Sequence, residues 1–353
     1  MRRGWLPRLS FVDLFLWAFR IAVVVLVVSG TIGTLTKGAY TREQWLDFLI
    51  FGLAQGGIYA LIALGYTMVY GILRMINFAH GEVFMSGSFT AYHFALAMGS
   101  SGFLNRQPLL ALLVILIVSA VTSTAVALLV ERVAYRPLRR APRLVPLITA
   151  IGASFFLQYA FKGLYGSGIK AYPEFQVFRG EWVFAGIGIL RTQVIVLVTA
   201  AVMMFGLYQM VMRTKTGKAM RAVSEDKDAA ALMGINVDRI IVVTFAIGGA
   251  MAGVAGVLYG LVFKQVHFFM GFVPGIKAFT AAVLGGIGNI PGAMVGGMFL
   301  GVVESIGPAL FLDGLGIVAP YQLRDVIAFT MLVMVLVFRP SGILGERLAA
   351  KKA

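Results

Sequence analysis

Uninterrupted apolar runs of about 20 residues recur along the chain, with short polar stretches between them. A helix rises about 1.5 Å per residue, so a run of this length spans the ~30 Å hydrocarbon core of a membrane. Only 13% of the residues are charged, whereas 59% are hydrophobic, and a soluble domain carries about 25% charged residues. The runs also lack the alternating pattern of a membrane β-barrel. The sequence therefore predicts an all-α polytopic membrane protein.

Ten spans can be drawn, and we expect about 8–10 transmembrane helices, some short or broken, in a single transmembrane domain over 1–353. The spans are 16–36, 45–71, 83–100, 108–130, 145–165, 192–212, 239–262, 274–288, 292–312 and 322–338. The first loosely resembles a signal peptide, but Asp13 and Arg20 interrupt its apolar run and no clear cleavage site follows. We expect it to be retained as the first helix.

The basic residues predict the orientation of the chain. They concentrate in segment 1–10, in the loops 131–143 and 213–239, and from Arg339 onward. Basic residues near the ends of spans favour the cytoplasm, so both termini and both loops are expected inside. The net charge of +15 follows from this pattern, and nucleic acid is not an expected partner. The absence of cysteine excludes a disulfide framework and thiolate metal sites, and it fits a bacterial inner (cytoplasmic) membrane.

Two spans near the carboxyl end are short and are separated by glycine. Residues 274–288 would reach only about 22 Å as a helix, and a glycine-rich segment, 285–297, follows. Broken helices are tolerated in membranes only where protein or a water cavity satisfies the freed backbone. Two interpretations stay open: the pair of spans, with Gly285, Gly286 and Gly288, lines a pathway, or it forms a tight hairpin turn.

Glycines four residues apart predict close packing of helix backbones. These pairs are Gly52 and Gly56, Gly249 and Gly253, Gly292 and Gly296, and Gly297 and Gly301. The spacing is common in membrane helices, so it predicts close packing and does not specify a dimer.

The longest predicted cytoplasmic loop, 213–239, combines charges with helix-forming residues. Ser224 suits an N-cap, Glu225 and Asp226 suit the first turn, and Gly234 is placed to end the helix. We therefore expect a short amphipathic helix from about residue 222 to 233. Such a helix fits a groove on a partner protein, and its composition equally fits a solvated connecting helix.

The segment "EDKDAAALMGI" resembles the E-A-A-x-x-x-G signature of ABC-importer permeases. Glu225, Ala229, Ala230 and Gly234 match, although three residues separate the glutamate from the alanines. The stretches 52–82, 277–305 and 338–347 look like the permease subunit of branched-chain amino-acid ABC importers, and the resemblance covers about residues 45–347. In that family the charged loop is the coupling helix, which docks into the nucleotide-binding subunit, so the resemblance assigns Glu225, Asp226, Ala229, Ala230 and Gly234 to coupling.

The resemblance implies a non-catalytic half of a transporter for branched-chain amino acids. The implied partners are a second homologous permease subunit, two ABC ATPase subunits, a periplasmic or lipid-anchored binding protein, and membrane lipid. ATP and magnesium would then be bound by the partners, with no cofactor in this chain. The sequence agrees, because it contains no G-x-x-x-x-G-K-[ST] phosphate-binding motif.

Three polar residues, Asn77, His80 and Glu82, lie close together at the junction of the second and third spans. A metal site is disfavoured because the chain has three histidines and "HGE" lacks the H-E-x-x-H spacing. One remaining explanation is a proton or substrate relay, since ionisable groups at membrane depth are usually functional. The favoured one is structural or gating: Asn77 and His80 cap helix ends, while Glu82 pairs with Arg74 or a neighbouring subunit.

Other charges fall at membrane depth. Lys277 and Glu304 lie in adjacent short spans, and their pairing would offset the cost of burying either. Asp47, Arg324 and Asp325 lie near span starts, where snorkelling suffices to explain them. The candidate walls of a pathway are the spans around Gln55, Tyr59 and Tyr66 and the hairpin 277–301.

Two alternative functions stay open. A self-contained secondary transporter or channel, driven by an ion gradient, would use the intramembrane charges, although no acidic relay follows one helix. A related ABC permease for urea or amides would share the same architecture. No nucleophile–base or metal set indicates an enzyme.

Overall fold

The computed structural model describes residues 10–139, 141–142, 144–184, 187–318, 320–339 and 341–345. Helices dominate this part of the chain. They are α1 (Phe11–Lys37), α2 (Arg42–Leu73), α3 (His80–Ser100), α4 (Phe103–Arg106), α5 (Pro108–Val130), α6 (Leu144–Tyr165), α7 (Arg191–Arg213), α8 (Lys215–Glu225), α9 (Lys227–Leu232), α10 (Val237–Phe263), α11 (Phe272–Gly285), α12 (Ile290–Gly307) and α13 (Arg324–Phe338). Short π- or 3-10-helical turns extend α5 and α12 and precede α13.

Strands are few and short in the described residues. β1 (Lys170–Ala171) pairs antiparallel with β4 (Gln265–Val266), and β2 (Glu181–Phe184) pairs antiparallel with β3 (Ile187–Leu190). Within the described ranges, eight helical stretches are long and apolar enough to cross a membrane. The other two expected spans, 83–100 and 274–288, form α3 and α11, so a helix lies at each of the ten positions. The prediction of an all-α polytopic membrane protein is confirmed.

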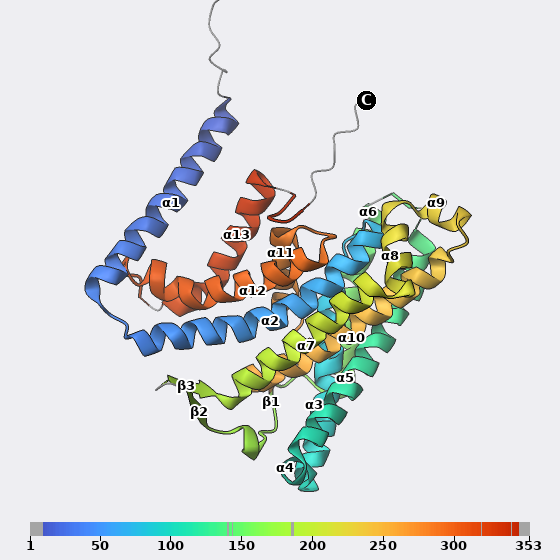
Figure 1. Ribbon diagram of the computed structural model, residues 1–353, viewed down its shortest axis with the longest axis horizontal. Coiled ribbons are helices and arrows are strands. Elements are labelled where there is room, and N and C mark those ends of the chain that lie inside the picture. The colour runs from blue at the N-terminus through green and yellow to red at the C-terminus, as the bar shows by residue number, and fades with distance from the viewer. Residues whose placement is uncertain are drawn as a thin grey trace, which may run out of the picture.

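The helices form one bundle with two distinct ends (Figure 1). The start of α1, α8 and α9 lie at one end, which we call the inner end after the predicted orientation. α4, β2 and β3 lie at the other, which we call the outer end. Many of the basic residues behind the predicted orientation, those in 1–9 and 346–353 and at 140 and 143, lie outside the described residues. The cytoplasmic position of both termini therefore stays a prediction.

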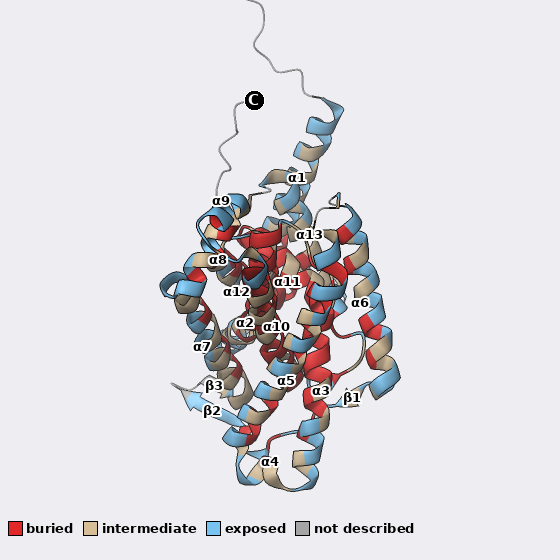
Figure 2. Cartoon of the chain, turned by 90° about the vertical axis from the view of Figure 1, so that its right-hand side faces the viewer, coloured by how far each residue is buried: buried red, intermediate tan, exposed pale blue. Residues whose placement is uncertain are grey.

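α2 lies at the centre of the bundle and packs against α12, α10, α11 and α7. Nearly all of its residues from Gly52 to Leu73 are buried. Figure 2 shows that buried residues gather on the helices at the centre of the bundle, whereas exposed residues cover the outward faces of α5 and α6. These outward faces are the surfaces available to lipid.

Glycine is the reason that α2 and α12 can lie so close together. A Cβ added to Gly52 would lie 2.8 Å from the Cα of Val302, and one added to Gly56 would lie 2.8 Å from the Cα of Met298. On the facing helix, Gly297 packs against Ala60, and a Cβ on Gly301 would collide with the backbone of Gly56. Close packing at these two glycine pairs is confirmed, and we call this contact the α2–α12 seam.

The other two glycine pairs also mark backbone contacts. A Cβ on Gly249 would lie 2.9 Å from the carbonyl oxygen of Ser123 on α5. One on Gly253 would lie 2.5 Å from that of Ser119, whose hydroxyl donates a 2.7 Å hydrogen bond to the Gly253 carbonyl. Gly292 and Gly296 pack in the same way against the end of α11. Their predicted close packing is likewise confirmed.

α11 and α12 form a tight helical hairpin. The turn contains Gly286 and Gly288, at φ values of 107° and 96°, which only glycine adopts readily. Asn289 caps α12 by accepting a 2.9 Å hydrogen bond from the amide of Gly292. The segment 341–345 covers the turn, and the amide of Leu344 donates a 3.1 Å bond to the carbonyl of Gly285. Of the two interpretations, the structure shows the hairpin geometry; a pathway role of Gly285, Gly286 and Gly288 stays a prediction.

Candidate functional site

The predicted coupling segment consists of two helices rather than one. α8 ends at Glu225, and Ser224 lies in its last turn, so the expected N-cap at Ser224 is wrong. Asp226 is the true N-cap of α9, because its carboxylate accepts hydrogen bonds of 2.9 and 3.0 Å from the amides of Asp228 and Ala229. Gly234, at φ 83°, follows the helix as predicted.

The exposure of α9 suits contact with another protein. Leu232 and Met233 are 89% and 82% exposed at the end of this short helix, which projects from the inner end (Figure 1). Glu225, Asp226 and Ala229 are also exposed, whereas Ala230 is buried against this chain. A large apolar tip beside charges, outside the membrane spans, is typical of a surface that a partner covers.

Two arginines, Arg74 and Arg139, lie between the coupling segment and the rest of the bundle. Arg74, in the left-handed conformation after α2, donates a 3.1 Å hydrogen bond to the carbonyl of Ser224. Arg139 forms ion pairs with Glu131 and with Asp238 at the start of α10. Partial burial and the nearby Arg139 and Arg74 guanidinium groups lower the pKa of Lys227. Because Arg74 bonds to Ser224, a movement of α8 and α9 would directly displace the end of α2.

The junction between α2 and α3 holds Asn77 and His80 in buried positions. The expected capping roles are wrong: Ala79 occupies the N-cap position of α3 without a side-chain bond. Instead, the hydroxyl of Tyr135 donates to the side-chain oxygen of Asn77 at 3.2 Å and to the carbonyl of Ile76 at 3.0 Å. The His80 ring packs edge-on against Tyr66, with ring centroids 4.9 Å apart. A Cβ on Gly65 would collide with that imidazole, so the glycine makes room for it.

Glu82 is buried, and its partners lie on α6. One carboxylate oxygen accepts hydrogen bonds from Gln158 at 2.6 Å and from Ser154 at 3.3 Å. The other oxygen is buried and has no hydrogen-bond partner in the described part of the chain. The expected pairing of Glu82 with Arg74 is wrong, because Arg74 turns to α8.

The first turns of α3 and α11 meet beside Glu82. A Cβ on Gly81 would lie 2.5 Å from the carbonyl oxygen of Gly271, and one on Gly275 would lie 3.0 Å from the Cα of Gly81. Both helices therefore direct the positive ends of their dipoles toward the same buried carboxylate, which stabilises it. The sequence places these two segments almost 200 residues apart.

Lys277 and Glu304 form the predicted buried pair, with 2.5 Å between the ammonium nitrogen and a carboxylate oxygen. Lys277 also donates to Asp325 at 2.6 Å, and Arg324 lies 3.8 Å from the Glu304 carboxylate. The second oxygen of Glu304 is buried, and the residues that the structure describes offer it no hydrogen bond. Arg324 and Asp325 are thus more than snorkelling charges, because they complete a four-charge cluster with Lys277 and Glu304.

The remaining pathway candidates lie in the buried centre of α2. Gln55 donates a 2.6 Å hydrogen bond to the hydroxyl of Tyr59, and the Lys277 ammonium lies 5.9 Å from the centre of the Tyr59 ring. Tyr66 packs between His80 and Phe279 of α11. Gln55 and Tyr59 thus join the four-charge cluster, while Tyr66 belongs to the junction at Glu82.

Two cavities open between the helices toward the outer end. The larger, of about 460 Å³, is called the outer cavity here. Its lining combines charged and polar side chains with an apolar wall: Glu43, Asp47, Phe48, Phe51, Gln55, Glu181, Gly188, Leu190, Gln193, Glu304, Ser305, Tyr321 and Arg324. Cavities of about 300–1,000 Å³ with a few convergent polar groups are typical of small-molecule sites.

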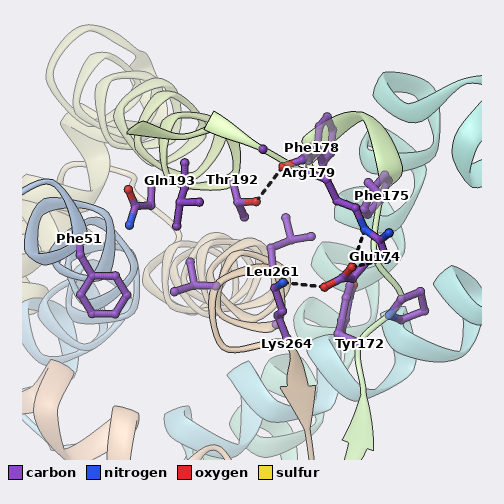
Figure 3. Close-up of a pocket in the computed structure, with 15 residues that line it drawn as sticks. Phe51, Tyr172, Glu174, Phe175, Phe178, Arg179, Thr192, Gln193, Leu261 and Lys264 are labelled. Atoms are coloured by element: carbon purple, nitrogen blue, oxygen red, sulfur yellow. Dashed lines mark hydrogen bonds and ion pairs between the residues drawn. The ribbon is translucent and has the colours of Figure 1, made fainter. Parts of the chain in front are cut away.

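The smaller cavity, of about 200 Å³, lies next to it and shares Phe51, Leu190 and Gln193 with it. Figure 3 shows Glu174 between Arg179 and Lys264 at its edge, with ion pairs of 2.6 Å on both sides. The hydrogen bonds from these cations, with that from Lys264 the stronger influence, lower the pKa of Glu174. The three charges of this triad are therefore paired with one another.

Several residues of these sites were not among the sequence candidates. Tyr135, Ser154 and Gln158 were missed. So was the acidic rim of the outer cavity, which consists of Glu43, Asp47 and Glu181. A polar residue such as Gln158 inside an apolar span carries a usable signal, because burying an amide in a membrane needs a partner. The identity of that partner depends on how α3 and α6 pack, which the sequence does not state.

The geometry is that of a multi-pass membrane transport subunit, with buried charges paired inside the bundle and a projecting inner segment. The chain matches the family described as the permease component of branched-chain amino acid transport systems over residues 48–336. The chain belongs to this family. Its recognition from the sequence motifs is confirmed.

Individual relatives carry names that match this family. The chain is 47% identical to the high-affinity branched-chain amino acid transport system permease protein BraD of Pseudomonas aeruginosa, over 86% of this chain and 96% of the relative. It is 43% identical to the corresponding permease protein LivH of Escherichia coli K12, over 86% of this chain and 97% of the relative. A probable branched-chain amino acid permease of Methanocaldococcus jannaschii is 29% identical over 81% and 88% of the two chains.

Proposed function

We propose that this chain is one of two permease subunits in an ATP-driven importer of branched-chain amino acids in a bacterial inner membrane. The family and the names of the relatives support the substrate class. The chain would form half of the translocation pathway, with a homologous permease as the other half and a periplasmic or lipid-anchored binding protein delivering substrate. Two ABC ATPase subunits at the inner end would bind ATP and magnesium, so that this chain carries no cofactor.

The observation that carries this proposal is the exposed α9 tip on a segment anchored to α2. Leu232 and Met233 offer the apolar contact, and the bond from Arg74 to Ser224 links that contact to the α2–α3 junction. ATP-driven closure of the partner subunits would shift α8 and α9 and, through Arg74, the helices around Glu82. The pathway would then open alternately to the two sides.

The pathway itself would run along two groups of side chains. The outer group is Gln55, Tyr59, Lys277 and Glu304, and the inner group is Tyr66, Asn77, His80 and Glu82. Polar and ionisable groups at membrane depth that face the interior of a bundle typically mark such routes. Strong binding at any single point would slow release, so few strong contacts are expected.

Purification of the tagged chain from its native membrane in mild detergent, with identification of co-purifying proteins, tests the proposal. We expect a second permease and ATPase subunits in the wild-type sample. Leu232→Asp and Glu225→Arg should each lower ATPase recovery by about tenfold, because they disrupt the contact surface. Val183→Asp is the matched control, since Val183 is 72% exposed at the outer end.

Recovery of the chain alone under several gentle conditions would overturn the proposal and favour a transporter driven by an ion gradient. Equal ATPase recovery with Leu232→Asp, Glu225→Arg and Val183→Asp would overturn the role of the α8–α9 segment. Uptake of urea or amides, without uptake of branched-chain amino acids, would overturn the substrate assignment.

A further inference from the structure

The outer cavity has a floor that is deeply buried and chemically unsatisfied. Gln55 and Glu304, which line it, are each only 1% exposed. Lys277 pairs with one oxygen of the Glu304 carboxylate, and the other oxygen has no hydrogen-bond partner among the described residues. A buried carboxylate oxygen without a donor is costly. The cavity therefore presents an acceptor that a ligand with N–H groups would satisfy.

The cavity lining also includes a positive group next to this carboxylate. The guanidinium nitrogen of Arg324 lies 3.8 Å from the Glu304 carboxylate, and Arg324 lines the same cavity. An α-amino acid carries an ammonium and a carboxylate on neighbouring atoms. A guanidinium beside a carboxylate is therefore complementary to the zwitterionic end of such a molecule.

The walls suit an aliphatic side chain. Phe48, Phe51, Leu190 and Tyr321 contribute apolar surface to the cavity lining. Its volume of about 460 Å³ leaves room for a small amino acid together with water. An isobutyl or isopropyl group would gain from burial against these side chains.

The rim sets the sign of charge that can enter. Three further carboxylates line the cavity, those of Glu43, Asp47 and Glu181, against the one guanidinium of Arg324. A cleft lined mainly by one sign of charge concentrates ligands that carry the opposite sign. This rim favours ligands with a free ammonium group and repels carboxylates that lack one.

We propose that the outer cavity is a low-affinity binding site for a branched-chain α-amino acid in its zwitterionic form. The ammonium group bonds to Glu304, the carboxylate to Arg324, and the aliphatic side chain packs on Phe48 and Phe51. The inference rests on the proposed function for its substrate class and adds to it a permease site that selects for the α-ammonium group. The amino acid would occupy this site after it leaves the binding protein and before it passes further into the bundle.

Saturation-transfer NMR on the purified complex, without its binding protein, is the direct test because it detects weak ligands. L-Leucine is the probe, and 4-methylpentanoate, which is leucine without the amino group, is the matched control ligand. We expect leucine to give the signal and 4-methylpentanoate to bind at least about tenfold more weakly, as expected for a lost charge-assisted hydrogen bond.

Variants assign the signal to the cavity. Glu304→Gln and, separately, Arg324→Gln should each weaken leucine binding by about tenfold. Arg324 is partly exposed, so its variant tests the site even if Glu304→Gln disturbs the Lys277 pair. Arg179→Gln is the matched control, because this arginine lines the neighbouring cavity of Figure 3.

Equal binding of leucine and 4-methylpentanoate would overturn the inference, as would unchanged leucine binding in both variants. A leucine signal that arises only when the binding protein is added would also overturn it. The proposed function is tested separately. It is overturned if the complex lacks ATPase subunits or does not take up leucine, whatever the NMR shows. If the complex takes up leucine normally and its cavity variants bind leucine like wild type, only the proposed cavity site is overturned and the proposed function stands.

Discussion

α1 and α2 are both long apolar helices, yet the structure uses them in opposite ways. The most apolar window of α1 has a mean hydropathy of 2.5, and none of it is buried in this chain. The corresponding window of α2 is less apolar, at 1.8, and 72% of it is buried. α1 contacts the rest of the described chain mainly at Gly30, Gly33 and Thr34, near the turn after α12.

The difference shows what determines position inside a membrane bundle. Lipid is as apolar as leucine, so hydropathy does not draw a helix into the protein core. Small residues and paired polar groups do, because they allow close backbone contact and need protein partners. α2 has Gly52, Gly56 and Gly65 at its contacts and the Gln55–Tyr59 bond inside it. α1 exposes valine, leucine and phenylalanine along most of its length.

The largest expected effect comes from breaking the buried four-charge cluster. Lys277→Met removes the cation between Glu304 and Asp325 and leaves the buried Glu304 carboxylate with only the longer 3.8 Å contact to Arg324, which costs about 3 kcal/mol. Arg20→Met on α1 is the matched control, because among the described residues that guanidinium stacks on Trp17 and Phe338 and forms no ion pair. Thermal unfolding in detergent should show a fall in Tm of roughly 10 °C for the first and little for the second.

A double variant tests the cause. Lys277→Met combined with Glu304→Met replaces the pair by apolar groups and should recover much of the lost Tm. If Lys277→Met and Arg20→Met lower Tm equally, then burial in the bundle does not distinguish the two charges.

The next effect concerns the α2–α12 seam. Gly301→Val would force a side chain into the backbone of α2 at Gly56, and such overpacking costs about 3 kcal/mol. Gly152→Val on the exposed face of α6 is the control, since nothing lies within 4 Å of a Cβ there. The yield of folded chain and its Tm should fall for the first variant only. Similar losses at both positions would show that the seam is not a special contact.

A smaller effect is expected at Glu82. Glu82→Gln keeps an oxygen that accepts from Gln158 and Ser154, but it removes the charge that faces the first turns of α3 and α11. If that charge takes part in gating, uptake by the reconstituted complex should fall by about tenfold while Tm changes little. Asp13→Asn at the start of α1 provides the comparison. Wild-type uptake by Glu82→Gln would contradict the gating role.

The sequence predicted much of this arrangement because the relevant signals are local. Apolar runs predicted all ten helix positions, glycine spacing predicted where backbones pack closely but not which helices meet, and the adjacency of two short spans predicted the Lys277–Glu304 pair. Each of these depends on helix periodicity or on neighbouring spans, which a single sequence contains.

The errors concern partners that are distant in sequence or that compete locally. Glu82 bonds to Gln158, 76 residues away, because α3 packs on α6. Ser224 and Asp226 both suit an N-cap. Asp226 is the N-cap of α9 because its carboxylate accepts hydrogen bonds from two amides at once. The outer cavity draws on α2, β2, α12 and α13, and the relative placement of these elements follows only from the whole fold.

The smallest expected effect lies at the coupling segment, the helices α8 and α9. Like α1, this segment has exposed apolar residues, and like α2, it is held by polar contacts with other parts of the chain. Asp226→Ala removes the N-cap of α9 and should cost about 1 kcal/mol of local helix stability. The bundle does not depend on that helix, so Tm should stay nearly constant while hydrogen exchange at Ala229 and Ala230 rises about fivefold. Asp228→Ala is the matched control, since its neighbouring carboxylate caps nothing in the described structure. Unchanged exchange in Asp226→Ala would mean that partner contacts, rather than the cap, define α9, and the segment would then be ordered mainly by the ATPase subunits.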